Sequence, residues 1–268
     1  ALLAGSDLAA LSLNSIYCRA WLVLVYALLL VSVRMKGRRP VWMPVAAGAV
    51  ALGAAIALTR AAFFCGDLGV TVLDVGQGQS VLVRTGVFLT LVDCGGDSRE
   101  GPGKTAADYL QSLGLGGIDL LVVSHYHADH ANGIPQLLRR IDVGEIVLPD
   151  VEEDSPLRAE IIAAAVERGV PVRFVQETAW FRPSRADMIA VFPPMLAGKN
   201  VNELGLTVLA SHRALDVLIT GDMEEEGERR LTETVPLPDV EVLVAGHHGS
   251  NTSNTPELLE AVRPELAL

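Results

Sequence analysis

Cysteine and positive charge are both scarce in this chain of 268 residues. The three cysteines, Cys18, Cys65 and Cys94, do not have the spacing of a zinc site. Lysine and arginine number 21 against 32 acidic residues, which gives a net charge of −11. An acidic protein has no electrostatic attraction for nucleic acid, which counts against tight non-specific DNA binding. Internal repeats and low-complexity tracts are also absent from the sequence, so a repeat architecture is not indicated.

Charge and hydropathy divide the chain near residue 66. Residues 1–66 carry six basic groups and one acidic group, about +5, which leaves about −16 for the remainder. Residues 20–33 are apolar and uncharged, and residues 41–58 form a second uncharged run, long enough to cross a bilayer. We predict two transmembrane helices here, with two buried core helices as the alternative. A cleavable signal peptide is not indicated, because the first segment lacks a basic start.

The segment between these runs, residues 34–40, holds four positive charges and therefore predicts a cytoplasmic loop. The second helix then runs outward, so the chain after Cys65 is expected outside the cytoplasm of a multi-pass membrane protein. A Cys65–Cys94 disulfide is possible there, although no pattern supports it. Because the chain opens on Ala1 rather than Met, we expect a fragment with further helices upstream.

The most informative stretch is the run His125–His130. It places four metal-binding side chains within six residues: His125, His127, Asp129 and His130. They follow an apolar run, residues 118–123, that predicts a buried strand. Imidazoles and a carboxylate with no basic residue among them suit zinc or manganese. A histidine-rich surface loop is the alternative.

Two further predicted strands end in residues of the same kind. Residues 218–221 lead into Asp222, and residues 242–246 lead into His247 and His248. Alone, an aspartate after a strand is usually part of a turn, and a histidine pair is more often surface. Together the three strand ends predict a two-metal hydrolase, in which a carboxylate bridges the ions.

These motifs, HxHxDH, then TGD, then HHGS, resemble those of the metallo-β-lactamase superfamily. Residues 73–80, which contain DVGQGxS, and VDCGG at residues 92–96 resemble the C-terminal domain of ComEC-type competence proteins of bacterial DNA uptake. The resemblance covers about residues 69–268. It implies a membrane segment in residues 1–66 and a hydrolase domain in residues 67–268 that is truncated at its C-terminus.

The resemblance also implies a role for each motif residue. His125 and His127 hold one metal, Asp129 and His130 hold the second, and Asp222 bridges them. His248 is favoured over its neighbour to complete the second site because it directly precedes a glycine. The candidate catalytic residues are Asp129 and His247, of which His247 touches the substrate or assists the leaving group. Two supporting roles follow: Asp93 orients the histidine loop, and Ser250 donates to phosphate oxygens or belongs to a helix-capping loop.

One ligand is missing, because the superfamily commonly supplies a third histidine to the first metal. The only histidine in the relevant region, His212, lies in a predicted hairpin turn at the end opposite Asp222, roughly 20 Å away, and is expected to be a solvated turn residue. Asn202 and Glu203 lie at the Asp222 end. Asn202 matches a position of the ComEC branch, and Glu203 is a possible extra oxygen ligand.

A coarse pass along residues 67–268 predicts strands and helices in two similar halves, and hence an α/β fold, an αββα sandwich with the site at one edge. An antiparallel meander is expected at residues 70–93, and a hairpin at residues 206–220. Helices are expected at residues 104–113, 134–140, 156–168, 224–234 and 256–262, and a further strand begins in residues 264–268.

The expected function is a nuclease of the phosphodiesterase type with two divalent ions, Zn²⁺ or Mn²⁺, attached to a DNA-uptake channel. Its expected partners are single-stranded DNA, the membrane and other competence proteins, and its oligomeric state is open. Two alternatives remain: a phosphoester or thioester hydrolase for a small substrate, and a non-catalytic module whose metals are structural.

Overall fold

The computed structural model describes residues 15–34, 42–64, 68–195 and 200–268. The chain divides into two compact units, one of residues 1–66 with 108–116 and the other of residues 67–107 with 117–268. The predicted basic loop, apart from Arg34, lies outside the described residues, as does Cys65. The roles predicted for them stay predictions.

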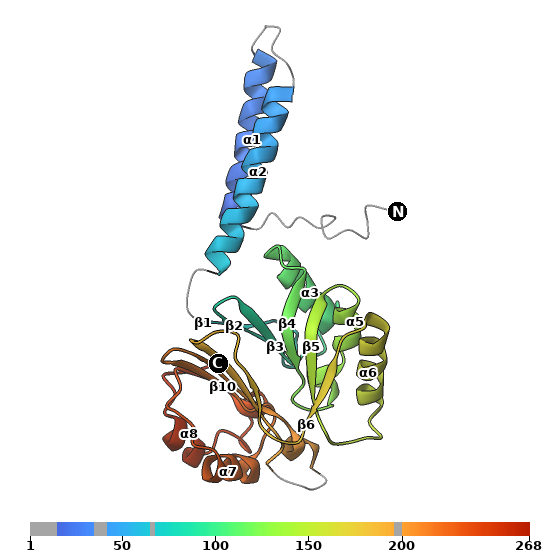
Figure 1. Ribbon diagram of the computed structural model, residues 1–268, viewed down its shortest axis with the longest axis vertical. Coiled ribbons are helices and arrows are strands. Elements are labelled where there is room, and N and C mark those ends of the chain that lie inside the picture. The colour runs from blue at the N-terminus through green and yellow to red at the C-terminus, as the bar shows by residue number, and fades with distance from the viewer. Residues whose placement is uncertain (1–14, 35–41, 65–67, 196–199) are drawn as a thin grey trace. The chain divides into compact units, whose positions relative to one another are not determined.

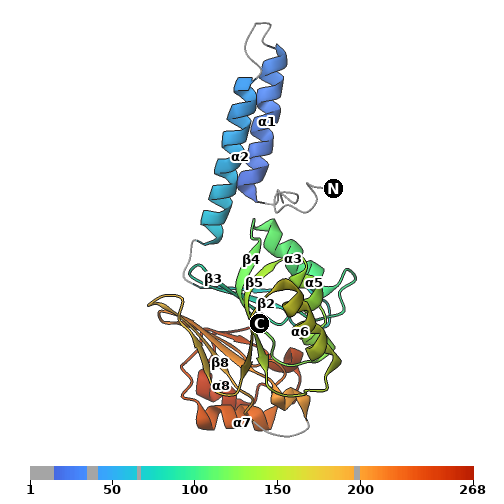
Figure 2. The ribbon, with the colours of Figure 1, turned by 45° about the vertical axis from the view of Figure 1, so that its right-hand side comes forward.

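The N-terminal part of the chain forms two long helices, α1 (Ile16–Arg34) and α2 (Trp42–Phe63), that run side by side (Figures 1 and 2). The indole N–H of Trp21 donates to the carbonyl oxygen of Gly48 at 2.7 Å and joins the two helices. Among the described residues, α2 alone is long and apolar enough to cross a membrane, and the apolar part of α1 is shorter. Of the two predicted transmembrane helices, only α2 therefore meets the criterion of length.

Large apolar side chains remain exposed on both helices. Val50 on α2 is 74% exposed and Tyr26 on α1 is 66% exposed. A helix in the core of a water-soluble protein buries one apolar face at least, so this exposure argues against the alternative of two buried core helices.

Two six-stranded sheets form the second unit. The first sheet has the order β1 (Leu68–Val72), β2 (Val81–Thr85), β3 (Phe88–Val92), β4 (Gly117–Val122), β5 (Asp142–Pro149) and β6 (Val172–Val175). The second has the order β12 (Leu266–Ala267), β11 (Val242–Val244), β10 (Leu215–Ile219), β9 (Thr207–His212), β8 (Asp187–Phe192) and β7 (Ala179–Phe181). β1 to β3 pair in antiparallel fashion, which confirms the predicted meander, whereas β3 to β6 are parallel.

The inner faces of the two sheets pack on each other through branched side chains. This shared core includes Val81, Val122, Val208 and Ile219. On the outer face of the second sheet, Leu218 and Leu243 pack against Leu258 of helix α8 (Pro256–Val262). Helices α5 (Ile134–Leu138) and α6 (Pro156–Arg168) lie on the other side of the sandwich, beside the first sheet (Figure 2). The predicted αββα sandwich is therefore confirmed.

In the described part of the chain, eight helical segments accompany the strands. Six are α-helical: α3 (Pro102–Ser112), α4 (Ala128–Ala131), α5 (Ile134–Leu138), α6 (Pro156–Arg168), α7 (Glu225–Thr234) and α8 (Pro256–Val262). Two are short 3₁₀ turns, η1 (Val201–Leu204) and η2 (Gly246–Gly249), and η2 carries the histidine pair. α6 begins as predicted, because the Ser155 hydroxyl accepts the N–H of Arg158 and Pro156 occupies the first position. It ends at Gly169, whose left-handed φ of 67° is typical of a helix C-terminus.

Besides the turns η1 and η2, the described residues contain β7 and α4, which the sequence did not predict. β7 is a three-residue edge strand that ends just before Arg182 and Pro183, too short to give an alternating pattern. α4 is a single turn inside the histidine motif, where polar residues replace the apolar periodicity of a helix. The strand expected at the C-terminal end of the chain is present as β12.

Candidate metal centre

The histidine motif occupies the loop after β4 and the single turn of α4. His125 and His130 are completely buried, whereas His127 is exposed. Nε2 of His125 lies 3.1 Å from Nδ1 of His127, so two ring nitrogens meet at one point. The motif therefore combines buried and solvent-facing imidazoles within one turn of chain.

Asp222 lies between the two halves of this motif. It follows β10 and is only 2% exposed. Its Oδ1 lies 2.9 Å from Nε2 of His130, and its Oδ2 lies 3.8 Å from Nε2 of His125. The carboxylate thus presents one oxygen to each half, which is the arrangement a bridging ligand needs.

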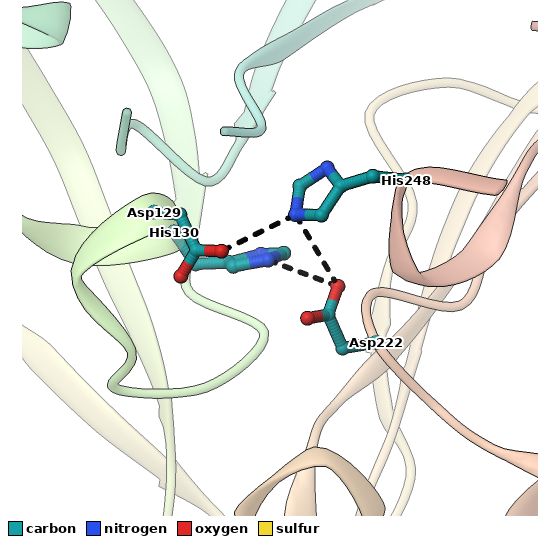
Figure 3. Close-up of side chains that lie close together, drawn as sticks. All are labelled: Asp129, His130, Asp222 and His248. Carbon is teal, nitrogen blue, oxygen red and sulfur yellow. Dashed lines mark ion pairs between the residues drawn. The ribbon is translucent and has the colours of Figure 1, made fainter. Parts of the chain in front are cut away.

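The histidine pair approaches Asp222 from the loop after β11. His247 and His248 have left-handed φ angles of 51° and 52°, which are uncommon for residues other than glycine. Nε2 of His248 lies 3.4 Å from Oδ2 of Asp129 and 3.9 Å from Oδ1 of Asp222 (Figure 3). Nε2 of His247 lies 3.7 Å from the other oxygen, Oδ2, of Asp222. The loop therefore brings one histidine to each oxygen of Asp222.

Ligand atoms converge in two groups, within each of which all atoms lie within 4.8 Å of one another. One group contains Asp129, His130, Asp222 and His248, and the other contains His125, His127 and Asp222. These are the same sets that the sequence analysis assigned to the second and the first metal. The structure brings the residues together, and the ions themselves stay a prediction.

The chemistry of these groups fits divalent ions. Nε2 of His130 and Oδ1 of Asp222 are buried 2.9 Å apart, and neither atom has a hydrogen-bond partner among the described residues. Burying such atoms unpaired is costly, and a shared cation removes that cost.

The protonation states of His125 and Asp222 favour a cation as well, whereas His130 has to release its ring proton when a metal binds. Burial, and then the charge of His130, holds the pKa of His125 well below its usual value, so its imidazole is neutral. Burial alone raises the pKa of Asp222, but His130 outweighs it and lowers that pKa to about 2. A neutral imidazole and an ionised carboxylate are the forms that bind metals.

Asp93 holds the histidine motif in place from beneath. Its Oδ1 accepts the backbone N–H of Ser124 at 2.6 Å, and its Oδ2 accepts the Ser124 hydroxyl at 2.7 Å. The same Oδ2 lies 2.8 Å from Nδ1 of His130. Burial alone lowers the pKa of His130, but Asp93 and then Asp222 outweigh it and raise that pKa to about 10. This is the geometry of a carboxylate that orients an imidazole ligand, the role predicted for Asp93.

The glycine-rich motif at residues 73–80 contacts the same histidine loop. This contact was not predicted from the sequence. The Gln79 side chain donates to Asp93 Oδ2 at 2.8 Å, and its backbone N–H donates to the carbonyl oxygen of Asp129 at 2.8 Å. A Cβ at Gly95 would lie only 2.2 Å from the backbone nitrogen of His130. These contacts explain the glycines by close backbone packing.

Of the two candidate oxygen donors before β9, Glu203 joins neither ligand group among the described residues. The Asn202 amide donates to Glu224 Oε1 at 3.2 Å. Glu203 is buried, and its Oε2 lies so close to Gly227 of α7 that a Cβ there would be 2.1 Å away. Burial raises the pKa of this carboxyl group. The Glu203 side chain therefore points toward α7 and not toward the first metal group.

His212 is not the solvated turn residue that the sequence analysis expected. It is the last residue of β9, is 7% exposed, and places Nδ1 2.5 Å from Oδ1 of Asp187 on β8. The expectation was wrong because the turn begins one residue later, which leaves this ring paired inside the sheet. The expected distance from Asp222 is supported by the register, since His212 pairs with Leu215 and Val208 with Ile219.

Two other predicted residues lie close to the centre. The Ser250 hydroxyl lies 3.0 Å from that of Thr252, on the loop of the histidine pair. Cys94 is completely buried, carries a free thiol, and donates its backbone N–H to the carbonyl oxygen of His130 at 2.8 Å. Cys94 is thus unpaired in this structure, in contrast to the possible disulfide.

Comparison with known proteins places this geometry in a family. Residues 73–268 match the family described as the metallo-beta-lactamase superfamily. The chain belongs to the metallo-β-lactamase superfamily. The match covers both sheets apart from β1, and it includes every residue of the two ligand groups. The expected resemblance to this superfamily is confirmed.

Within the superfamily, the chain is similar to competence proteins. It is 34% identical over 207 residues to competence protein ComA of Neisseria gonorrhoeae, which covers 75% of this chain and 27% of that protein. It is 26% identical over 216 residues to ComE operon protein 3 of Bacillus subtilis, covering 74% and 28%. It is 28% identical over 201 residues to recombination protein 2 of Haemophilus influenzae, covering 74% and 24%. The chain thus spans about a quarter of the length of these relatives, and the expected resemblance to ComEC-type proteins is confirmed.

Proposed function

We propose that residues 67–268 form a metal-dependent phosphodiesterase domain that cuts DNA within a membrane-bound DNA-uptake protein. The observation that carries this proposal is the position of Asp222, which turns one carboxylate oxygen to each of two groups of metal-type ligands. Similarity to competence proteins supports DNA as the substrate.

His125, His127 and Asp222 are the proposed ligands of the first ion, and Asp129, His130, His248 and Asp222 those of the second. Zn²⁺ and Mn²⁺ both suit imidazole and carboxylate donors. Two such ions supply an activated water nucleophile and offset the charge that develops on the leaving oxygen.

The residues around this centre divide into an anchored side and an open side. His125, His130 and Asp93 are completely buried and hold the centre to the sandwich. His127 and His248 are exposed, so substrate approaches from their side. Ser250 and Thr252 lie on the loop of the histidine pair, where their hydroxyl groups are suited to donate to phosphate oxygens.

Single-stranded DNA is the proposed substrate because of charge and stiffness. The residues after 66 have a net charge of about −16, whereas the whole chain has a net charge of −11. This part of the chain therefore repels a polyanion. A flexible strand bends into a recessed site more easily than a stiff duplex. Attachment to an uptake channel raises the local DNA concentration and compensates for weak affinity.

The domain is proposed to lie outside the cytoplasm of a multi-pass bacterial membrane protein, beside other competence proteins. The length and hydropathy of α2 and the positive charges of residues 34–40 support this topology. A reporter that is active only outside the cytoplasm, fused after Cys65, is expected to be active, and a cytoplasmic signal there contradicts the topology.

The experiment that tests the function is digestion of labelled DNA by the full chain purified in detergent. With Mn²⁺ or Zn²⁺ we expect the wild-type chain to cleave single-stranded DNA and to cleave duplex DNA more slowly. We expect His127→Ala to lose both cleavage activities. An exposed residue of α8 provides the matched control, Glu257→Gln, which is expected to cleave normally. Equal residual cleavage by His127→Ala indicates contamination. Turnover of a phosphocholine ester or thioester without DNA cleavage favours a small-substrate hydrolase, and metal binding without any turnover favours a non-catalytic module.

A further inference from the structure

We infer that His247 is the third histidine of the first metal group, beside His125 and His127. The inference rests on the metal centre of the proposed function and fills the position for which the sequence supplied no histidine. It replaces the substrate-contacting role that the resemblance implied for His247.

Four histidines divide between the two carboxylate oxygens of Asp222. Nε2 of His125 and Nε2 of His247 lie 3.8 and 3.7 Å from the same oxygen, Oδ2. Nε2 of His130 and of His248 lie 2.9 and 3.9 Å from Oδ1. The histidine pair is therefore not one ligand and one spectator, because each member faces a different metal group.

The separations suit ligands of one ion. Donors about 2.0–2.1 Å from a tetrahedral zinc ion lie roughly 3.3 Å from one another. His247 and His125 approach Oδ2 at distances only a few tenths of an ångström longer than this. The His247 side chain is 28% exposed and lies outside the group of atoms that are all within 4.8 Å of one another, so its ring has to shift toward an ion to bind it.

The other ring nitrogen of His247 is also oriented as in a metal ligand. Nδ1 lies 3.3 Å from the hydroxyl oxygen of Thr252 and 3.7 Å from Oε1 of Glu224. Glu224 is in turn fixed by the side-chain amides of Asn200 and Asn202, at 3.0 and 3.2 Å. Metal-binding imidazoles usually donate their second N–H to such a partner, which leaves the lone pair of Nε2 to face the ion.

The backbone of the loop explains how adjacent residues reach different ions. Two successive left-handed residues turn the chain sharply, and the two rings lie 6.4 Å apart with their planes at 65°. The backbone N–H of His247 donates at 3.0 Å to the carbonyl oxygen of Gly221, the residue before Asp222. The loop is thus tied to Asp222 itself, with one ring on each side of the carboxylate.

The test counts bound Zn²⁺ per full chain in detergent, by native mass spectrometry and by competition with a chelator. Asparagine tolerates the left-handed backbone, so His247→Asn and His248→Asn are matched variants that avoid backbone strain. Each is expected to retain one tightly bound ion and to weaken the other by about tenfold or more. His247→Cys, which keeps a zinc ligand, is expected to restore two ions, and circular dichroism checks that every variant is folded.

Double variants identify the ion that each residue serves. His127→Ala with His247→Asn is expected to retain one ion, because both changes affect the same group. His127→Ala with His248→Asn is expected to retain none. Two tightly bound ions in His247→Asn, or none in the first double variant, overturn the inference. Neither result bears on DNA cleavage, whereas a wild-type chain that binds no metal overturns both the inference and the proposed function.

Discussion

Glu228, which is completely buried on α7, accepts the backbone N–H of Asn254 at 2.6 Å. Its second oxygen accepts the N–H of Thr255 at 2.8 Å. The Asn254 side chain in turn bonds both backbone groups of Gly246, at 2.8 and 3.1 Å. The loop of the histidine pair is therefore closed at both ends by one buried carboxylate and one amide, which maintain its left-handed residues.

Replacing the Glu228 carboxylate should destabilise the loop of the histidine pair and lower the affinity for metal. In Glu228→Gln, an amide nitrogen replaces one acceptor, which leaves a buried N–H unpaired and costs about 1–3 kcal/mol of unfolding free energy. We expect the affinity for Zn²⁺, measured by competition with a chelator, to fall about tenfold or more. Glu225→Gln, on the exposed side of the same helix, serves as the control. Unchanged metal affinity in Glu228→Gln would show that the loop does not depend on this bond.

A second prediction concerns Asp93, which supports His130. Asn tolerates the left-handed φ of 61° at this position but lacks the charge and one acceptor. Asp93→Asn is expected to weaken Zn²⁺ binding about 10–100-fold, because the His130 ring is no longer held. Asp97→Asn, in an exposed loop of the same sheet, is the matched control. Equal affinities in the two variants would remove the supporting role of Asp93.

A third prediction separates stability from metal binding at His212. Its buried pair with Asp187 lies at the strand end opposite Asp222, so His212→Ala should leave the metal content unchanged. Breaking a buried pair costs about 3–5 kcal/mol, which chemical denaturation will detect. Loss of metal in a variant that remains folded would contradict the distance inferred from the register.

The same pair gives the wild-type chain a dependence on acid. Burial alone raises the pKa of Asp187, but hydrogen bonds from Ser184 and His212 outweigh it and hold that pKa below its usual value. A carboxyl group with a lowered pKa stabilises the fold above its unfolded pKa, and this contribution disappears as the pH falls through the folded pKa. The stability difference between wild type and His212→Ala should therefore shrink below about pH 4. A constant difference there would exclude this linkage.

A fourth prediction concerns the thiol of Cys94. Burial raises its pKa from 9.0 to about 12, so the folded protein keeps the proton that the unfolded chain releases. The resulting stability is fully present below pH 9 and is lost as the pH rises toward about 12, by up to about 1.4 kcal/mol per pH unit. Cys94→Ala should show a smaller loss between pH 8.5 and 10.5. The native thiol should also resist alkylation until the chain unfolds, and rapid alkylation of the folded chain would contradict its burial.

Much of the fold and of the ligand set could be predicted from sequence because both depend on local signals. The ends of predicted strands pointed to His125, Asp222 and His248 as ligands, and Ser155-Pro156 predicted the start of a helix. Contacts between residues far apart in the sequence could not be predicted. The burial of His212 depends on Asp187, 25 residues earlier, and the turn of Glu203 toward Gly227 depends on the docking of α7. The separate directions of His247 and His248 follow from two left-handed residues that no local propensity predicts.

The bridging position of Asp222 is the centre of this account, and elemental analysis of the purified full chain tests it most directly. Both ligand groups share this one carboxylate, so Asp222→Asn should remove both ions, whereas Asp216→Asn, earlier on β10, should keep them. We predict two divalent ions per wild-type chain and per Asp216→Asn chain, and fewer than one in Asp222→Asn. A wild-type chain without metal, or unchanged metal content in Asp222→Asn, would contradict the account.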